Sequence, residues 1–206
     1  VGDAMLAIWY GEALSAETRS GPCRAALEMA EAMAEFNRTT DGPKLPVRIG
    51  LHSGHVSIGT VGAIDHFEYR AVGDCVNTAS RLEGLNKYLK TRIVVSEDVI
   101  AGIDNFLTRP LGRFILAGKV NAIPVHELIG ERDRAHGGQF LVSETFGRAL
   151  EAYRKKLWEE AIRLFEEVLE MSPEDGPSRF YLLLCREFIV KPPPDGWEGS
   201  VSLASK

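Results

Sequence analysis

The chain has 206 residues, which is enough for one medium-sized domain and a smaller appendage. Its 24 basic and 29 acidic residues give a net charge of −5, which argues against nucleic acid or an anionic membrane surface as a general partner. No apolar run approaches the roughly 20 residues of a membrane-spanning helix, and no signal peptide is recognisable. The three cysteines, Cys23, Cys75 and Cys185, form no CxxC pattern, which favours a reducing, cytoplasmic setting over a disulfide framework or a zinc site.

The first third of the chain predicts a strand, a helix and then two more strands. Residues 4–10 form an apolar run that suits a buried strand, although so short a run is also compatible with helix. Residues 21–38 place small and apolar side chains at helical spacing and predict a helix. Residues 39–46 are a loop rich in turn formers, and the alternation within residues 47–62 is typical of a strand, a turn and a strand.

The next stretch, EYRAVGDCVNTASRLEGLNK at residues 68–87, holds an asparagine and an arginine four residues apart after a glycine turn. A helix that starts near Asp74 places Asn77 and Arg81 on one face, because residues i and i+4 are neighbours on a helix surface. Spacing alone leaves two interpretations open. The pair is either part of a solvated polar stripe or a pair of side chains directed at a substrate.

The remaining elements before residue 130 alternate again. TRIVVSEDVIAGI predicts a strand, followed by a helix near Glu97 that Ser96 could cap. LGRFILAGKVNAIPVHELI predicts two strands joined at Gly118 and Lys119. Hairpins mixed with crossover helices indicate an α+β fold rather than a regular βαβ repeat.

The last third is predominantly helical. Residues 131–139 are polar and glycine-containing and predict a linker, and residues 143–171 have the spacing of a helical hairpin that resembles one tetratricopeptide repeat, with a capping helix at 177–189. Since one repeat cannot bury its own apolar face, we expect it to dock on the main domain or on a partner. We therefore divide the chain into a main domain at 1–129, a linker at 130–142, a helical extension at 143–190 and a proline-rich irregular tail at 191–206.

Four motifs in this order resemble the catalytic domain of class III adenylate and guanylate cyclases, the nucleotide cyclase homology domain. They are GDAMLAIW at 2–9, VRIGLHSGHVSIGTVG at 47–62, YRAVGDCVNTASRLEGLNK at 69–87 and LAGKVNAIPVHEL at 116–128. The resemblance covers residues 1 to about 129 and implies a ferredoxin-like, palm-type mixed sheet with helices packed on it.

The resemblance also implies a reaction, in which the ribose 3′-oxygen of a nucleoside triphosphate attacks its own α-phosphorus and gives a 3′,5′-cyclic monophosphate and pyrophosphate. Such chemistry depends on positioning and on neutralising charge. By resemblance, Asn77 orients the ribose, Arg81 stabilises charge on the α-phosphate and Lys119 contacts the terminal phosphates. These residue types suit the roles, since Asn both donates and accepts hydrogen bonds and Arg is a permanent forked cation. The alternative for Lys119 is a solvated surface lysine.

Two divalent ions, Mg²⁺ or Mn²⁺, assist this reaction in the family, and the resemblance matches Asp3 to the second of its two metal-binding aspartates. The alternative for Asp3 is a turn residue beside Gly2. The family's first metal-binding aspartate lies in a strand some forty residues before the GDA motif and is not in this sequence. We therefore expect the chain to be truncated at its N-terminus and inactive, or nearly so, by itself.

Arg70 departs from the family pattern. It occupies the position where adenylate-specific members carry Asp or Thr to accept a hydrogen bond from adenine, and Arg has no acceptor. Either a backbone carbonyl reads the base or base selectivity is relaxed, so ATP is expected from the family, with GTP as the less favoured substrate. Alternatively, Arg70 is structural and pairs with Glu68 or Asp74.

The family's active site forms between two domains arranged head to tail, so the resemblance implies a homodimer, and apolar side chains of the first helix are candidates for its interface or for the core. The expected protein is a bacterial-type adenylate cyclase of cyclic-nucleotide signalling, with a cytoplasmic catalytic region and a sensor or membrane segment upstream. One alternative is a catalytically silent homologue that binds nucleotide or regulates a partner. A second is an interaction scaffold built on residues 143–190, which offer little surface for that role.

Overall fold

The computed structural model describes residues 4–11, 15–63 and 66–203, with the backbone only for residues 61–63 and 66–69. Its elements, in chain order, are α1 (Ala16–Thr39), β1 (Ile49–Leu51), β2 (Ser57–Ala63), β3 (His66–Val72), α2 (Asp74–Leu89), β4 (Ile93–Ser96), α3 (Glu97–Ile100), β5 (Phe106–Ile115), β6 (Ile123–Glu131), α4 (Gly137–Arg154), α5 (Trp158–Met171), α6 (Gly176–Val190) and β7 (Ser200–Ser202).

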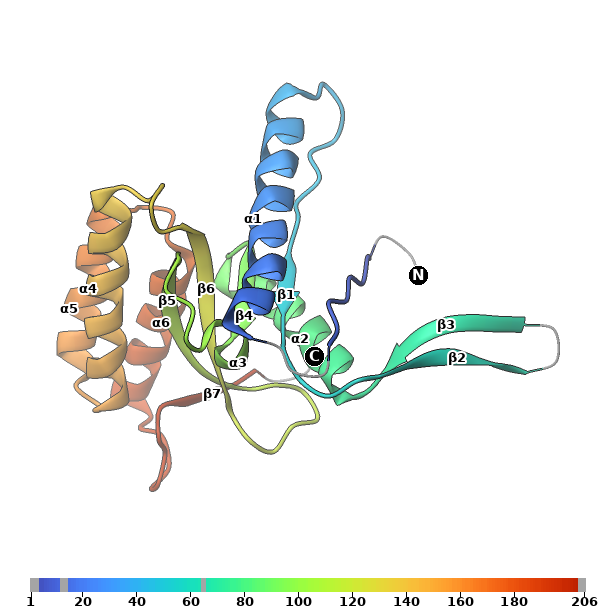
Figure 1. Cartoon of the computed structure of the whole chain (residues 1–206). Coiled ribbons are helices and arrows are strands. Elements are labelled where there is room, and N and C mark those ends of the chain that lie inside the picture. The colour runs from blue at the N-terminus through green and yellow to red at the C-terminus, as the bar shows by residue number, and fades with distance from the viewer. Residues whose placement is uncertain (1–3, 12–14, 64–65, 204–206) are drawn as a thin grey trace.

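The described strands form one mixed sheet and one separate ribbon. The sheet has five strands in the order β1-β4-β6-β5-β7, with β1 parallel to β4, β7 parallel to β5, and antiparallel pairs in between. The ribbon pairs β2 with β3 in antiparallel register and projects from the body of the molecule (Figure 1). A mixed sheet with crossover helices confirms the predicted α+β class.

Helices cover both faces of the sheet, and successive residues of β4 show how. Ile93 and Val95 point to one face and pack with Cys23, Ala26 and other residues of α1, whereas Val94 points to the other face. This alternation follows from the two-residue repeat of a strand. α1 and α3 therefore cover one face, and α2 together with α4, α5 and α6 covers the other. Figure 1 shows α4, α5 and α6 on the opposite side of the sheet from α1.

Two local predictions in the first half differ from the structure. The apolar residues 4–10 form no strand and are exposed, because no strand of the described chain pairs with them; Trp9 instead lies beside Gly21 of α1. The segment 47–62 does contain two strands, but β1 joins the main sheet and β2 joins the ribbon. Its partner β3 was not predicted, since its sequence runs into the glycine turn before α2.

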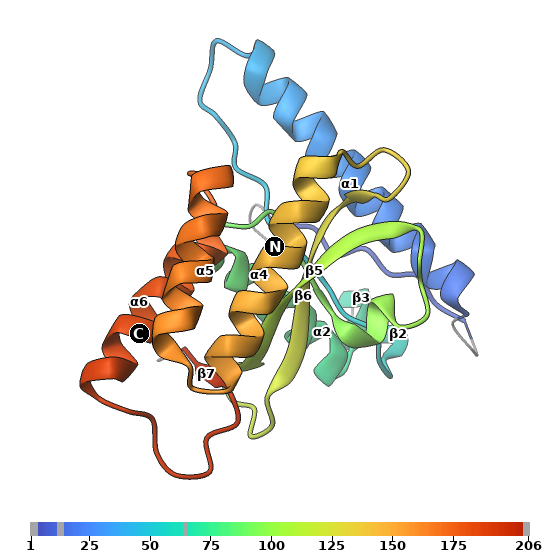
Figure 2. The same ribbon diagram turned by 90° about the vertical axis from the view of Figure 1, so that its left-hand side faces the viewer.

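The C-terminal helices form an antiparallel stack against the sheet (Figure 2). Tyr153 and Tyr181 are fully buried within it, and their ring centroids lie 4.8 Å apart in an edge-to-face arrangement. Tyr153 also contacts Trp158 at 5.6 Å and Trp197 at 5.1 Å between ring centroids. The predicted helical hairpin is confirmed, whereas its relation to a tetratricopeptide repeat stays a prediction.

A buried ion network fastens these helices to the sheet. Arg109 of β5 pairs with Glu127 of β6 at 2.7 Å and with Asp175 at 2.6 Å, and all three side chains are largely buried. Asp175 also accepts a hydrogen bond from the Ser178 backbone at 2.9 Å and so caps α6. The Tyr181 hydroxyl donates to the Leu111 carbonyl at 2.6 Å. One continuous core thus extends from the sheet into α4, α5 and α6.

The tail departs from the irregular structure predicted for it. Residues 192–199 contain turns, but Ser200–Ser202 form strand β7 beside β5, with Arg113 opposite Ser200. Local composition could not reveal this pairing, because the partner strand lies far away in the sequence. The four-part division of the chain stays a prediction. Among the residues that the structure describes, no helix combines the length and the apolar character needed to cross a membrane.

Candidate active site

Helix α2 carries two of the predicted site residues and is fixed to the sheet by its buried face. A side chain at Gly50 of β1 would collide with the backbone of Ala79 and Glu83, so only glycine allows this close approach. Asn86 is buried and donates to the Ile49 carbonyl at 3.0 Å, while its own side-chain oxygen accepts from Thr91 at 2.8 Å. The close approach at Gly50 and the hydrogen bond from Asn86 therefore fix the position of α2 against β1.

The opposite face of α2 is open to solvent. Leu82, Leu85 and Leu89 are buried, whereas Asn77 is exposed and Arg81 is half-buried one turn further along the helix. The predicted placement of Asn77 and Arg81 on one helix face is thus confirmed, and the burial of the leucines fixes which way that face points.

The turn between β5 and β6 brings Lys119 to the same place. Gly118 has a φ of 69°, which favours glycine, and the Lys119 N–H donates to the Leu116 carbonyl at 2.9 Å to close the turn. A Cβ at Gly118 would lie 3.3 Å from Nη2 of Arg81, so this turn and the Arg81 guanidinium are in contact range. The structure therefore brings Arg81 and Lys119 together from elements distant in the sequence.

Asp74 is a member of this group that sequence reasoning did not assign to the site. Its carboxylate, at the first residue of α2, accepts a hydrogen bond from the Lys119 ammonium and forms an ion pair with it. The hydrogen bond from Lys119 is the main reason that the pKa of Asp74 is lowered, and the positive charges of Lys119 and Arg81 lower it further. An acid in the first turn of α2 was the available signal, but its partner could not be known from sequence.

His52 lies beside this group at the end of β1. Its Nδ1 is 2.8 Å from the Ser96 hydroxyl, and the two groups form a hydrogen bond. The prediction that the Ser96 side chain caps α3 is therefore wrong, since that side chain makes no capping hydrogen bond. Burial lowers the pKa of His52, and the Lys119 charge acts in the same direction, against the carboxylates of Asp98 and Asp74. The lowered pKa of His52 favours the neutral imidazole beside Lys119.

The remaining predicted site residues are Arg70 and Asp3. Arg70 is exposed on β3, opposite Gly59 of β2. Its side chain is not free, since it interacts with another group of the protein. Its role in base selection stays a prediction. Asp3 lies outside the described residues, so its metal role stays a prediction too, as does the expectation that this chain alone is inactive.

The described residues do not by themselves form a metal site. No group of three or more His, Cys, Asp or Glu side chains within residues 4–11, 15–63 and 66–203 is arranged to hold an ion. The carboxylate of Asp74 already forms an ion pair with Lys119. Asp74 and its neighbours therefore do not fit a metal, and what the described site offers is a pair of cations beside an amide side chain.

Comparisons with known proteins identify the family of the chain. The family described as the adenylate and guanylate cyclase catalytic domain matches residues 1–129. The chain is 35% identical over 133 residues to adenylate cyclase 1 of Rhizobium meliloti (strain 1021), which covers 63% of this chain and 20% of that protein. It is 31% identical over 141 residues to an adenylate cyclase of Anabaena cylindrica, covering 62% and 27% of the two chains. The chain thus spans less than a third of these relatives.

A structural comparison gives the same fold. The crystal structure of the adenylyl cyclase CyaB from P. aeruginosa superposes with a TM-score of 0.51 at 20% identity, covering 61% of this chain and 65% of that chain. Because the family model matches more than half of the chain, the chain belongs to the adenylate and guanylate cyclase catalytic domain family. Its fold is the α+β cyclase fold followed by a C-terminal helical region.

Proposed function

We propose that this chain is the catalytic region of an adenylate cyclase, which converts ATP to 3′,5′-cyclic AMP and pyrophosphate as a head-to-tail homodimer. The observation that carries this proposal is the meeting of Arg81 and Lys119 at Gly118, with Asn77 one turn away on the same open face of α2. ATP rather than GTP is favoured because relatives with 35% and 31% identity are named adenylate cyclases.

Each of the three side chains has a separate task in this reaction. Asn77 donates to and accepts from the ribose hydroxyls and so directs the 3′-oxygen toward the α-phosphorus. The Arg81 guanidinium binds the α-phosphate oxygens, on which charge builds up as the 3′-oxygen bonds to phosphorus and the bond to the pyrophosphate breaks. When bound, divalent ions of the kind this family uses would polarise the phosphates, and Asp3 is the proposed ligand for one of them.

Lys119 needs a partner in both states of the site. Without nucleotide it pairs with Asp74, whose side chain is 72% exposed, whereas the Lys119 side chain is only 20% exposed. We infer that the terminal phosphates of ATP replace Asp74 as the partner of Lys119, since phosphate oxygens carry more charge than one carboxylate. Asp74 thus keeps the lysine in position between turnovers and weakens ATP binding by competing for it.

The test of the function is the formation of cyclic AMP from ATP and Mn²⁺ by the full-length protein and by its Arg81→Ala variant. We expect the variant to lose about 10²- to 10³-fold in kcat, the usual effect of removing one group that stabilises transition-state charge, and to keep its melting temperature. Glu83→Gln on the same helix is the matched control, because Glu83 pairs with Arg48 and not with the site. A full-length protein that binds ATP without turnover would favour the catalytically silent homologue.

A further inference from the structure

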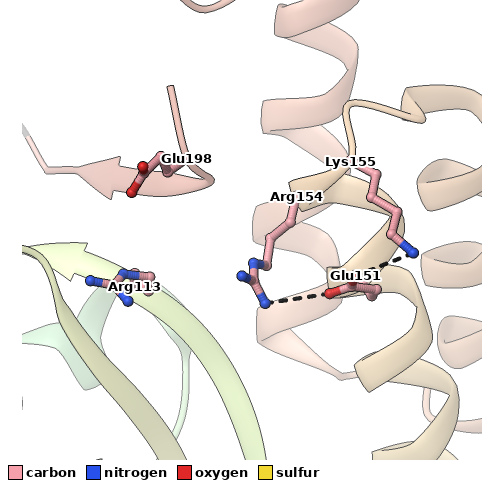
Figure 3. A pocket seen from close by; sticks show the side chains of 5 residues that line it. All are labelled: Arg113, Glu151, Arg154, Lys155 and Glu198. Carbon is pink, nitrogen blue, oxygen red and sulfur yellow. Dashed lines mark hydrogen bonds and ion pairs between the residues drawn. The ribbon is translucent and has the colours of Figure 1, made fainter. Parts of the chain in front are cut away.

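A second cluster of charged side chains lies away from α2, where the helical region meets the sheet. A pocket of about 420 Å³ opens between the end of α4, strand β5 and the segment that leads into β7. Figure 3 shows Arg113 and Glu198 on one side of this space and the end of α4 on the other. Its lining residues are Arg113, Glu151, Arg154, Lys155 and Glu198.

Three basic and two acidic side chains line this pocket, and only some of them form ion pairs with each other. Glu151 is shared between Arg154 at 3.4 Å and Lys155 at 3.3 Å. The side chain of Arg113 makes no hydrogen bond or ion pair with any residue that the structure describes, and the same holds for Glu198. Arg113 thus presents a complete guanidinium fork to the pocket, and the lining as a whole has one net positive charge.

The cations are supported by the surrounding backbone. Gly199 has a φ of 84°, and a Cβ there would lie 2.8 Å from Cγ of Arg154, so only glycine lets the stem of Arg154 pack against the chain. The ammonium of Lys156 lies 6.0 Å from the centre of the Trp197 ring, which helps to hold the segment before β7 against α4. The pairing of Arg113 with Ser200 aligns β5 with that segment.

We propose that this pocket binds a small phosphate-bearing anion of the diphosphate type, with Arg113 and Arg154 each taking one phosphate group. Forked guanidinium groups match phosphate oxygens, and the volume exceeds what a single phosphate fills. The lining is charged throughout and offers no apolar wall for a nucleobase. The ligand is therefore recognised through its phosphates alone.

Such a ligand would tie two parts of the molecule together. Arg113 belongs to the sheet of the cyclase domain, whereas Arg154 and Lys155 lie at the end of α4 in the helical region. Binding to the folded chain alone stabilises it by mass action, so the ligand should raise the melting temperature even when no nucleotide is turned over. This site and its test are independent of the proposed cyclase reaction.

The test is isothermal titration of the chain with sodium pyrophosphate, in a low-salt buffer without divalent ions, together with thermal melts. To exclude binding at Lys119, both are run in an Arg81→Ala and Lys119→Ala background. We expect saturable binding and a raised melting temperature, and Arg113→Gln should weaken binding about tenfold or more through the loss of charge-assisted hydrogen bonds. Glu198→Gln should tighten it, because a repulsive carboxylate is removed.

Arg163→Gln serves as the matched control, since Arg163 is an exposed arginine of α5 that pairs with Glu167 outside the pocket. ATP is titrated in parallel. Binding of ATP as tight as that of pyrophosphate identifies nucleotide phosphates as a source of the ligand, and weaker binding identifies the inorganic anion. The proposal is overturned if pyrophosphate does not bind in this background, or if Arg113→Gln binds it as tightly as Arg163→Gln does.

Discussion

The open face of α2 and the helical stack of α4, α5 and α6 differ in the burial of their side chains. On α2, Asn77 is exposed and the side chain of Asp74 is 72% exposed. Lys119 beside them is held by its ion pair with Asp74 and by the hydrogen bond from its N–H to the Leu116 carbonyl. In the stack, Tyr153 and Tyr181 are fully buried and each contacts several other aromatic rings. The comparison teaches that the proposed substrate-binding groups and the stabilising groups are separated in this chain, so substitutions should change either turnover or stability.

The largest effect on stability is expected from removing Arg109, the arginine of the buried ion network. Arg109→Met leaves the carboxylates of Glu127 and Asp175 buried without their cation, which should lower the free energy of unfolding by about 3–5 kcal/mol. Urea denaturation measures this. The matched control is Arg163→Met at an exposed ion pair, which should change the same free energy by less than about 1 kcal/mol. Equal effects of the two substitutions would contradict the assigned role of the network.

A smaller effect is expected from one hydroxyl in the same region. Tyr181→Phe removes the donor to the Leu111 carbonyl and leaves that buried oxygen without this partner, at a cost of about 1–3 kcal/mol in the free energy of unfolding. Tyr88→Phe is the control, because Tyr88 is 49% exposed and should tolerate the change. If Tyr181→Phe unfolds at the same urea concentration as the wild type, the hydrogen bond does not fasten α6 to the sheet.

On the site side, Asp74→Asn should change nucleotide binding and not stability. Removing the carboxylate that competes for Lys119 should lower KM for ATP by about two- to fivefold, the range typical of exposed ion pairs, and leave the melting temperature unchanged. The measurement is steady-state kinetics of the full-length protein, with Glu83→Gln as the control on the same helix. An increase in KM would show instead that Asp74 helps Lys119 to bind phosphate.

The smallest predicted effect concerns pH. Burial lowers the pKa of His52 from its ordinary value of 6.5, so the unfolded chain takes up the proton first as the pH falls. His52 therefore contributes nothing above about pH 6.5 and destabilises the native state progressively below it, until the pH reaches the lowered pKa. His52→Gln should lose less stability than the wild type between pH 7.5 and 5.5. The burial of His126 acts in the same direction but is common to both proteins, so it cancels in the difference.

The sequence predicted most elements because their signals are local. Helical spacing identified α2 and the hairpin of α4 and α5, and alternation identified β5 and β6, although each began or ended a few residues away from the prediction. The unsuccessful strand predictions concern pairing. Residues 4–10 have the composition of a buried strand, but no strand among the described residues pairs with them, and β7 forms only because β5 offers a free edge to residues 200–202.

For the site, the sequence determined the residue types and their spacing on α2, since Asn77 and Arg81 share a face of any helix that begins near Asp74. Only the tertiary structure decided that this face is the open one, that the Gly118 turn carries Lys119 to it, and that Asp74 is the partner of Lys119. It also decided that Cys23, Ala26, Leu27 and Ala30 of α1 belong to the core. The reason is physical: periodicity fixes what lies on one face of an element, but the packing of distant elements decides what that face meets.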